Sequence, residues 1–107
     1  MERGRVRLAR RFRMTRSFQE NGTAITLEEC KRYFSSKPDF TYSPSYTVKG
    51  KNATMTIDGD FFLWNIGGET IPFRHYDGDL YVAESHDAVV PKMMEIASDL
   101  RADVTEG

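Results

Sequence analysis

Apolar and polar residues alternate in four short stretches between positions 53 and 83, and a glycine-containing dipeptide separates each stretch from the next. The three dipeptides are Asp58-Gly59, Gly67-Gly68 and Asp77-Gly78. Dipeptides of this kind supply the positive φ angles of two-residue hairpin turns, and alternation over four to eight residues is typical of half-buried strands. The pattern therefore predicts an antiparallel meander joined by tight turns.

Counting outward from these turns assigns each strand residue to one of two faces, because directly opposed residues in a hairpin point to the same side of the sheet. All three counts place one apolar set on the same face, and a slip of one residue would scatter this set. We expect this face to form the core. Its predicted members are Ala53, Met55, Ile57, Phe62, Trp64, Ile66, Ile71, Phe73, Leu80 and Val82.

The opposite face of the meander carries a second apolar group. Phe61, Arg74 and Tyr81 fall in one cross-strand row, in which the Arg74 guanidinium can stack between the two rings, and Leu63 falls in the next row. The solvent-facing side of an antiparallel sheet is usually polar, so this face calls for a cover. Either the first helix or the N-terminal segment lies over it, or a second copy or a partner protein does, or it is simply exposed.

Two helices flank the meander. Thr26 and Glu29 form a capping box, which predicts a short helix over residues 27–34. A later apolar stripe has helical spacing and predicts a helix that starts between residues 87 and 90, is capped by Ser85 or Asp87, and ends at Leu100. The stripe consists of Val90, Met93, Met94, Ala97 and Leu100.

The remaining segments complete the expected fold. Residues 45–49 alternate and predict a further strand, which follows an irregular segment interrupted by prolines and leads into a turn at residues 50–52. Residues 102–105 are long enough for a short edge strand. We therefore expect one α+β domain, a meander of about five strands with a short N-terminal helix and a C-terminal helix packed on one face, and a short final strand.

Charge divides the chain unevenly. Residues 1–13 carry six arginines and one glutamate, a formal charge of +5, whereas residues 14–107 carry nine basic and fifteen acidic side chains, a formal charge of −6. We expect residues 1–13 to be a basic tail, or a stretch upstream of a true start at Met14, and residues 14–107 to form the domain. Two alternatives stay open: the arginines bind nucleic acid, or the segment forms a first strand.

Cysteine content and hydropathy suggest a compartment. Cys30 is the only cysteine, which excludes an internal disulfide and favours a reducing environment. No stretch approaches the ~20 apolar residues of a membrane span, and the N-terminus lacks the apolar core of a signal peptide. We expect a cytoplasmic protein with no membrane partner. Cys30 is expected to be a buried, inert thiol, since no local base is available to activate it.

Acidic residues gather near the predicted turns. If Asp58-Gly59 and Asp77-Gly78 are both turns, they lie at the same end of the sheet, with Asp60 directly opposite His75. A carboxylate beside an imidazole suits a general base or a metal ligand, and the metal candidates are Asp58, Asp60, His75, Asp77 and Asp79. Aspartate is also common at hairpin turns, so we favour a structural role and predict no metal, cofactor or catalytic residue. His86 lies too far along the chain to join this group, and we expect it near a helix N-terminus.

The last third of the chain resembles the ending of some small uncharacterised bacterial α+β domains. The resemblance rests on a D-G-x-hydrophobic strand at residues 77–82, an I-A-x-x-L helix at residues 96–100 and an A-x-V strand at residues 102–104. It covers about 30 residues and implies no activity.

No catalytic or cofactor motif stands out, so the sequence favours a small protein-binding or regulatory module. Its predicted partner-binding residues are Phe61, Leu63, Arg74 and Tyr81, and its partner is another protein or a second copy. A narrower version is an inhibitor or immunity-like protein, whose acidic body occupies a basic partner surface. The alternative is a small enzyme or divalent-metal-binding domain that uses Asp60 and His75.

Overall fold

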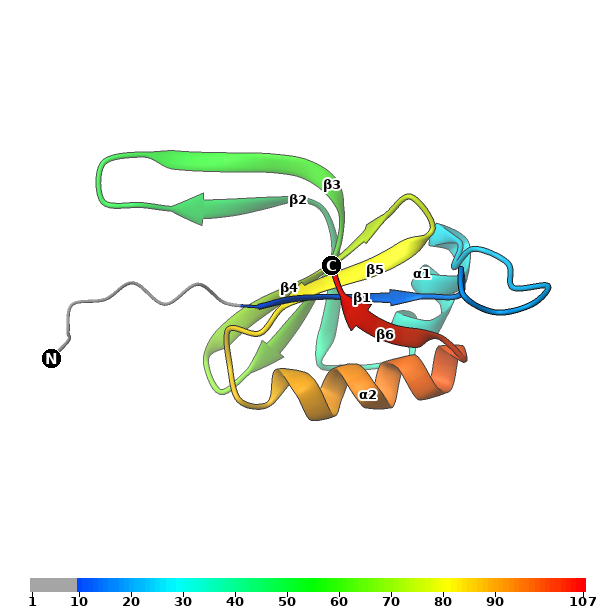
Figure 1. Ribbon diagram of the computed structural model, residues 1–107. Coiled ribbons are helices and arrows are strands. Elements are labelled where there is room, and N and C mark those ends of the chain that lie inside the picture. The colour runs from blue at the N-terminus through cyan, green and yellow to red at the C-terminus, as the bar shows by residue number, and fades with distance from the viewer. Residues whose placement is uncertain (1–9) are drawn as a thin grey trace, which may run out of the picture.

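The computed structural model describes residues 10–107, which fold into an α+β domain with one open antiparallel sheet of six strands and two helices (Figure 1). The strand order is β2-β3-β4-β5-β1-β6. The elements are β1 (Arg11–Thr15), α1 (Leu27–Ser35), β2 (Phe40–Lys49), β3 (Thr54–Ile66), β4 (Glu69–Tyr76), β5 (Asp79–Ala83), α2 (Val89–Leu100) and β6 (Asp103–Glu106).

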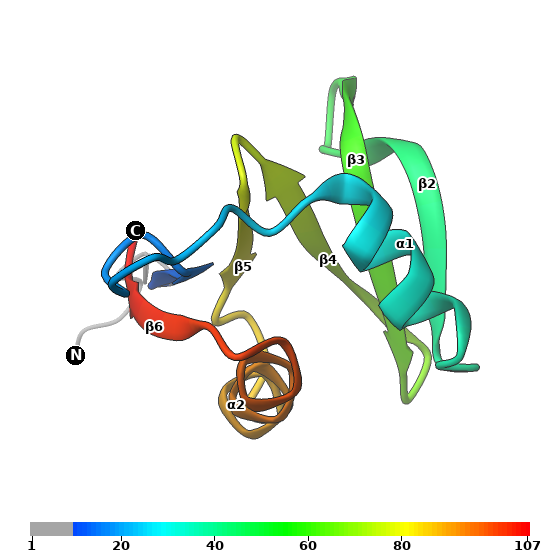
Figure 2. The same cartoon turned by 90° about the vertical axis from the view of Figure 1, so that its right-hand side faces the viewer.

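Both helices lie on the concave side of the curved sheet, α1 in front of β3 and β4 and α2 beneath β5 and β6 (Figure 2). α1 begins as the capping box predicts, because the Thr26 hydroxyl accepts the Glu29 amide hydrogen at 3.0 Å. α2 begins at Val89, inside the predicted interval, but its N-cap residue is Ala88 rather than Ser85 or Asp87. The Nδ1 of His86 accepts the Ala88 amide hydrogen at 3.0 Å, which confirms the expected place of His86 near a helix start.

The core lies between the concave sheet face and the helices, and most of the predicted core face is there. Six of its members are buried and Ile66 packs against them, with the Phe62 ring stacked on Phe34 of α1 at 4.7 Å between centroids. Along α2, Met94 is 53% exposed and Ile96 takes a core position instead. The six buried members are Phe62, Trp64, Ile71, Phe73, Leu80 and Val82.

The prediction of a turn at Asp58-Gly59 is wrong. Both residues lie inside β3, and the first hairpin turns at residues 50–53, where the Gly50 amide donates to the Ala53 carbonyl at 2.7 Å. Positive φ angles occur at Gly67, Gly68 and Gly78, so the other two predicted turns are confirmed. β3 continues through residue 58 because β2 offers it a partner strand ten residues long.

Asp58-Gly59 marks a bulge rather than a turn. Ser43 pairs with Phe61 and Ser45 with Asp58, so Pro44 alone faces Gly59 and Asp60 across the ladder. A bulge bends the strand that carries the extra residue, and β3 turns sharply there (Figure 1). The segment before Ser45, expected to be irregular, therefore belongs to β2.

Beyond this bulge, β2 and β3 continue as a projecting hairpin, which we call the arm (residues 45–57) (Figure 1). Tyr46 pairs with Ile57 and Val48 pairs with Met55. Met55 is 58% exposed and Ile57 half-buried outside the core cluster, so their predicted place in the core is wrong, as is that of the exposed Ala53. The projection lengthens the molecule to 48 × 30 × 24 Å.

β1 was the least expected strand. It pairs with β5 on one side and β6 on the other, and its side chains Phe12 and Met14 are buried in the core. Residues 11–13 thus belong to β1, in agreement with the alternative that the N-terminal segment forms a first strand. The expected domain boundary after residue 13 would cut this strand in two. Residues 1–9 of the expected basic tail lie outside the described residues. β6 confirms the short final strand.

Candidate binding groove

The convex back of the sheet carries the predicted row of aromatic and basic side chains, with one more arginine than expected. Phe61 pairs with Arg74, Arg74 with Tyr81, and Tyr81 with Arg13 of β1. The row Phe61-Arg74-Tyr81-Arg13 therefore crosses four neighbouring strands. Arg13 was missed because β1 was expected to be part of a tail, although the alternation Arg11-Phe12-Arg13-Met14 is a strand signal.

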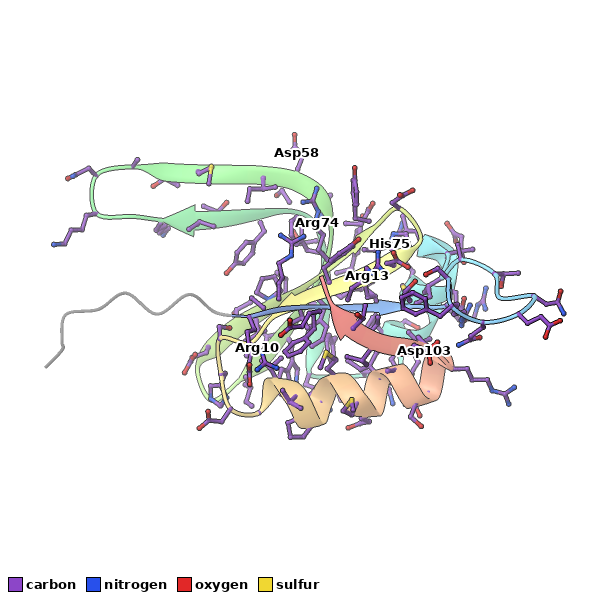
Figure 3. The ribbon with its side chains drawn as sticks, in the orientation of Figure 1. Arg10, Arg13, Asp58, Arg74, His75 and Asp103 are labelled. Atoms are coloured by element: carbon purple, nitrogen blue, oxygen red, sulfur yellow. The ribbon has the colours of Figure 1, made fainter. Side chains whose placement is uncertain are left out.

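The arm leans over this face and, with β4 and β5, encloses a groove of about 330 Å³. The bulge makes the groove possible, because it bends β3 so that the arm faces the back of the sheet instead of extending it. Figure 3 shows Arg74 between the arm and the sheet. The groove is lined by Arg11, Tyr46, Val48, Ile57, Phe61, Pro72, Arg74, Tyr81, Val82 and Ala83.

The four predicted partner-binding residues differ in accessibility. Phe61 is only 4% exposed, because it lies at the base of the groove with the Tyr46 ring 5.7 Å away. Leu63, Arg74 and Tyr81 are half-buried. Of the expected covers, α1 packs on the other face, and the arm covers Phe61 instead. The apolar wall that a partner would meet includes Val48, which is 42% exposed.

Arg74 stacks on two rings, one of them as predicted. The guanidinium carbon lies 5.5 Å from the centroid of Phe61 and 5.2 Å from that of Tyr76. Arg11, rather than Arg74, lies over Tyr81, at 5.2 Å. Gly59 permits this packing, since a Cβ there would lie 3.2 Å from the Arg74 Nε. The bulge glycine therefore shapes both the strand and the cation site.

Two donors on this face have no acceptor. The Nε atoms of Arg74 and Arg13 are buried and make no hydrogen bond within residues 10–107. Arg13 still has the Asp79 carboxylate at 3.8 Å, whereas Arg74 forms no ion pair with any described residue. A buried donor without a partner costs about 1–3 kcal/mol. Arg74 is thus a partly desolvated cation that pairs with no carboxylate among the described residues.

The predicted acidic end of the sheet is dispersed. Asp60 does lie opposite His75, as the register predicted. However, the Tyr42 hydroxyl donates to Asp60 at 2.6 Å, which raises the pKa of Tyr42, and the His75 Nε2 contacts the Ile25 carbonyl oxygen at 2.6 Å. Figure 3 shows Asp58 on the outer side of β3, pointing away from Arg74. The bulge is the cause, because it removes the turn that would have brought Asp58 to this end.

The other metal candidates serve the turn before β5. Asp77 adopts a φ of 51° in this turn, and Asp79 faces Arg13. Within residues 10–107, no three His, Cys, Asp or Glu side chains are arranged to hold a metal ion.

Cys30 and Glu29 are firmly held in α1. Cys30 is fully buried, and burial raises the pKa of its thiol to about 12. The Glu29 carboxylate accepts two hydrogen bonds from Arg16, which lowers the Glu29 pKa, and the same guanidinium donates to the Leu100 carbonyl oxygen at the end of α2. Arg16 therefore ties both helices to the segment after β1.

Comparison of the chain with protein-family models, curated proteins and solved structures gave no match in any of the three. The resemblance to small bacterial domains therefore stays a prediction. Within residues 10–107, neither helix combines the length and apolarity needed to cross a membrane.

Proposed function

We propose that the chain is a small cytoplasmic protein-binding or regulatory module without enzymatic activity, and that it binds its partner in the groove between the arm and the back of the sheet. The single observation that carries this proposal is Arg74, a cation without a carboxylate among the described residues, held over aromatic rings in an apolar groove. Arginine and aromatic side chains in partly desolvated pockets supply most of the binding energy of protein interfaces.

The arm gives a second reason to expect a partner. A two-stranded hairpin alone is marginally stable in water, and this one presents Val48 and Met55 to solvent at 42% and 58% exposure. A ligand seated against Val48 would bury part of this surface and hold the arm in place. Ligand binding would thus stabilise the arm.

The alternative, an enzyme or metal site at Asp60 and His75, has less support. The Asp60 carboxylate is hydrogen-bonded to Tyr42, and His75 to the loop before α1. Both side chains thus already have hydrogen-bond partners within the domain, so we give the groove priority. The inhibitor-like version instead uses the acidic body of the domain against a basic partner surface, so a partner that binds the wild type and the groove double variant equally would favour it.

The proposal is tested by selecting peptides from a display library of random 12-residue sequences on the full chain. The same selection is run on a double variant, Val48→Ser with Ile57→Ser, which removes apolar groove wall, and on Met94→Ser, which removes an exposed apolar side chain from α2. We expect peptides that bind the wild type and Met94→Ser but not the double variant. Absence of enrichment, or equal enrichment on all three proteins, would contradict the proposal.

A further inference from the structure

We infer that the groove takes an acidic, extended segment of a partner protein, whose carboxylate pairs with Arg74 while a neighbouring aliphatic side chain contacts the arm. This inference rests on the proposed function and adds the chemistry of the partner. It follows from the charges of the residues that line the groove and from the charges of the segments of this chain that could occupy it.

The charged residues lining the groove are all positive. Arg11 and Arg74 belong to the lining, and none of the lining residues is acidic. Neighbouring acids are paired or point elsewhere. Asp79 faces Arg13, Glu84 and Glu106 face Arg10, and Asp58 points to the outer side of β3 (Figure 3). A ligand carboxylate is therefore the group that this groove lacks.

The Arg74 geometry fits a carboxylate. The Arg74 guanidinium carbon lies over Phe61 and Tyr76, and the half-buried side chain can donate from its terminal Nη groups to the oxygens of a carboxylate. The Nε itself is buried against Gly59 and has no acceptor within residues 10–107, so a groove ligand would meet the terminal end of the guanidinium. The rest of the wall, Val48, Ile57 and Pro72, is apolar and suits an aliphatic side chain next to that carboxylate.

Two segments of the chain itself, the arm and residues 1–9, are poor occupants of the groove. Residues 45–57 include Lys49 and Lys51 and no acid, so an arm from a second copy would bring two more cations to Arg11 and Arg74. Residues 1–9 carry three arginines and one glutamate, and have the same sign. Like charges brought together in an interface cost binding free energy.

Single-stranded nucleic acid supplies anions but fits the groove less well. It binds proteins by stacking its bases on accessible aromatic rings. In the groove, Phe61 is buried, Tyr46 and Tyr81 are half-buried, and the rest of the uncharged wall is aliphatic. Residues 14–107 also carry a formal charge of −6, which repels a polyanion from the rest of the surface. An isolated carboxylate on a partner segment meets the local positive charge with less of this repulsion.

The test uses the peptides enriched by the selection above, labelled with fluorescein, and measures their affinity by polarisation at low and high salt. The variants are Arg74→Met, which removes the groove cation, and Arg32→Met, which removes the same charge from the exposed side of α1. We expect enriched peptides to contain Asp or Glu beside an aliphatic residue. Arg74→Met should weaken them about 10-fold or more, Arg32→Met should leave them unchanged, and changing the peptide Glu to Gln should match the Arg74→Met loss.

Several results would overturn the inference. Groove-dependent peptides that are neutral or basic, or that bind Arg74→Met and Arg32→Met equally, would refute the acidic partner but keep the proposed function. Failure to enrich any groove-dependent peptide would refute both. A dimer in sedimentation equilibrium that the groove double variant abolishes would assign the groove to a second copy, and Arg74-dependent binding of a labelled 12-nucleotide oligouridine, tighter than any peptide, would assign it to RNA. If Arg74→Met fails to melt cooperatively, Arg74→Gln replaces it.

Discussion

Removing the Arg74 cation should leave the isolated domain about as stable as before. In Arg74→Met the aliphatic stem is largely kept, while the buried Nε without an acceptor is removed. Relief of such a donor is worth about 1–3 kcal/mol. Loss of two cation–π contacts costs about 0.5–1 kcal/mol each, and a sulfur–aromatic contact can return part of this. The free energy of unfolding should therefore change by between about −1 and +2 kcal/mol.

Arg16→Met is the matched control. The Arg16 guanidinium is bonded to the Glu29 carboxylate and to the Leu100 carbonyl oxygen, so this substitution leaves two partly buried acceptors without their Arg16 donor. Hydrogen bonds to charged groups contribute about 1.5–3 kcal/mol, and we expect Arg16→Met to lose about 2 kcal/mol or more. The same change of residue thus distinguishes a structural arginine from one reserved for a ligand.

The assay is urea unfolding at 25 °C, followed by the fluorescence of Trp64 and extrapolated to zero denaturant. The reasoning would be refuted if Arg74→Met lost 2 kcal/mol or more, as Arg16→Met is expected to do. Arg74 would then be a structural cation, and its missing hydrogen bond would be no sign of a ligand.

Three further predictions concern the fold. Met14→Ala should cost about 2–5 kcal/mol because Met14 is fully buried, whereas Met55→Ala should cost about 0.5 kcal/mol or less on the exposed arm; equal losses in urea unfolding would contradict the register. The Glu29 pKa is lowered in the folded state, so its contribution to stability is complete above the ordinary value of 4.5 and is lost as pH falls through the folded pKa. The difference in unfolding free energy between wild type and Glu29→Gln should accordingly shrink as the pH falls below the ordinary value of 4.5, and a constant difference would argue against the ion pair. Cys30, with a pKa raised to about 12, should react with a thiol reagent at pH 8 only after denaturation, and immediate reaction of the native protein would show that it is accessible.

Local signals explain which parts of the fold the sequence predicted. Gly67-Gly68 and Asp77-Gly78 do form turns, and Thr26 does cap α1, because each depends on residues close together in the chain. Asp58-Gly59 has the same local chemistry as Asp77-Gly78 but became a bulge. The difference comes from β2, whose Pro44 lies opposite the bulge and whose length supports a continuous β3.

The candidate site was likewise predicted where it depends on local pattern and not where it depends on distant strand pairing. Alternation within β3, β4 and β5 was enough to place Phe61, Arg74 and Tyr81 in one row. It could not reveal the arm that covers Phe61, because the arm exists only through the bend at the bulge. Arg13 was recoverable from its alternation with Phe12 and Met14, but the density of arginines in residues 1–13 suggested a tail.

The most direct test of the central claim is NMR observation of the Arg74 Nε–H group, assigned by its loss in Arg74→Met. Titration with an enriched acidic peptide should shift this resonance as the carboxylate accepts hydrogen bonds from the same guanidinium, and should shift the amides of Val48 and Ile57 at the same peptide concentration. The Glu→Gln form of the peptide should produce neither shift at that concentration. Saturation by the acidic peptide with the Arg74 Nε–H resonance unmoved would contradict the account.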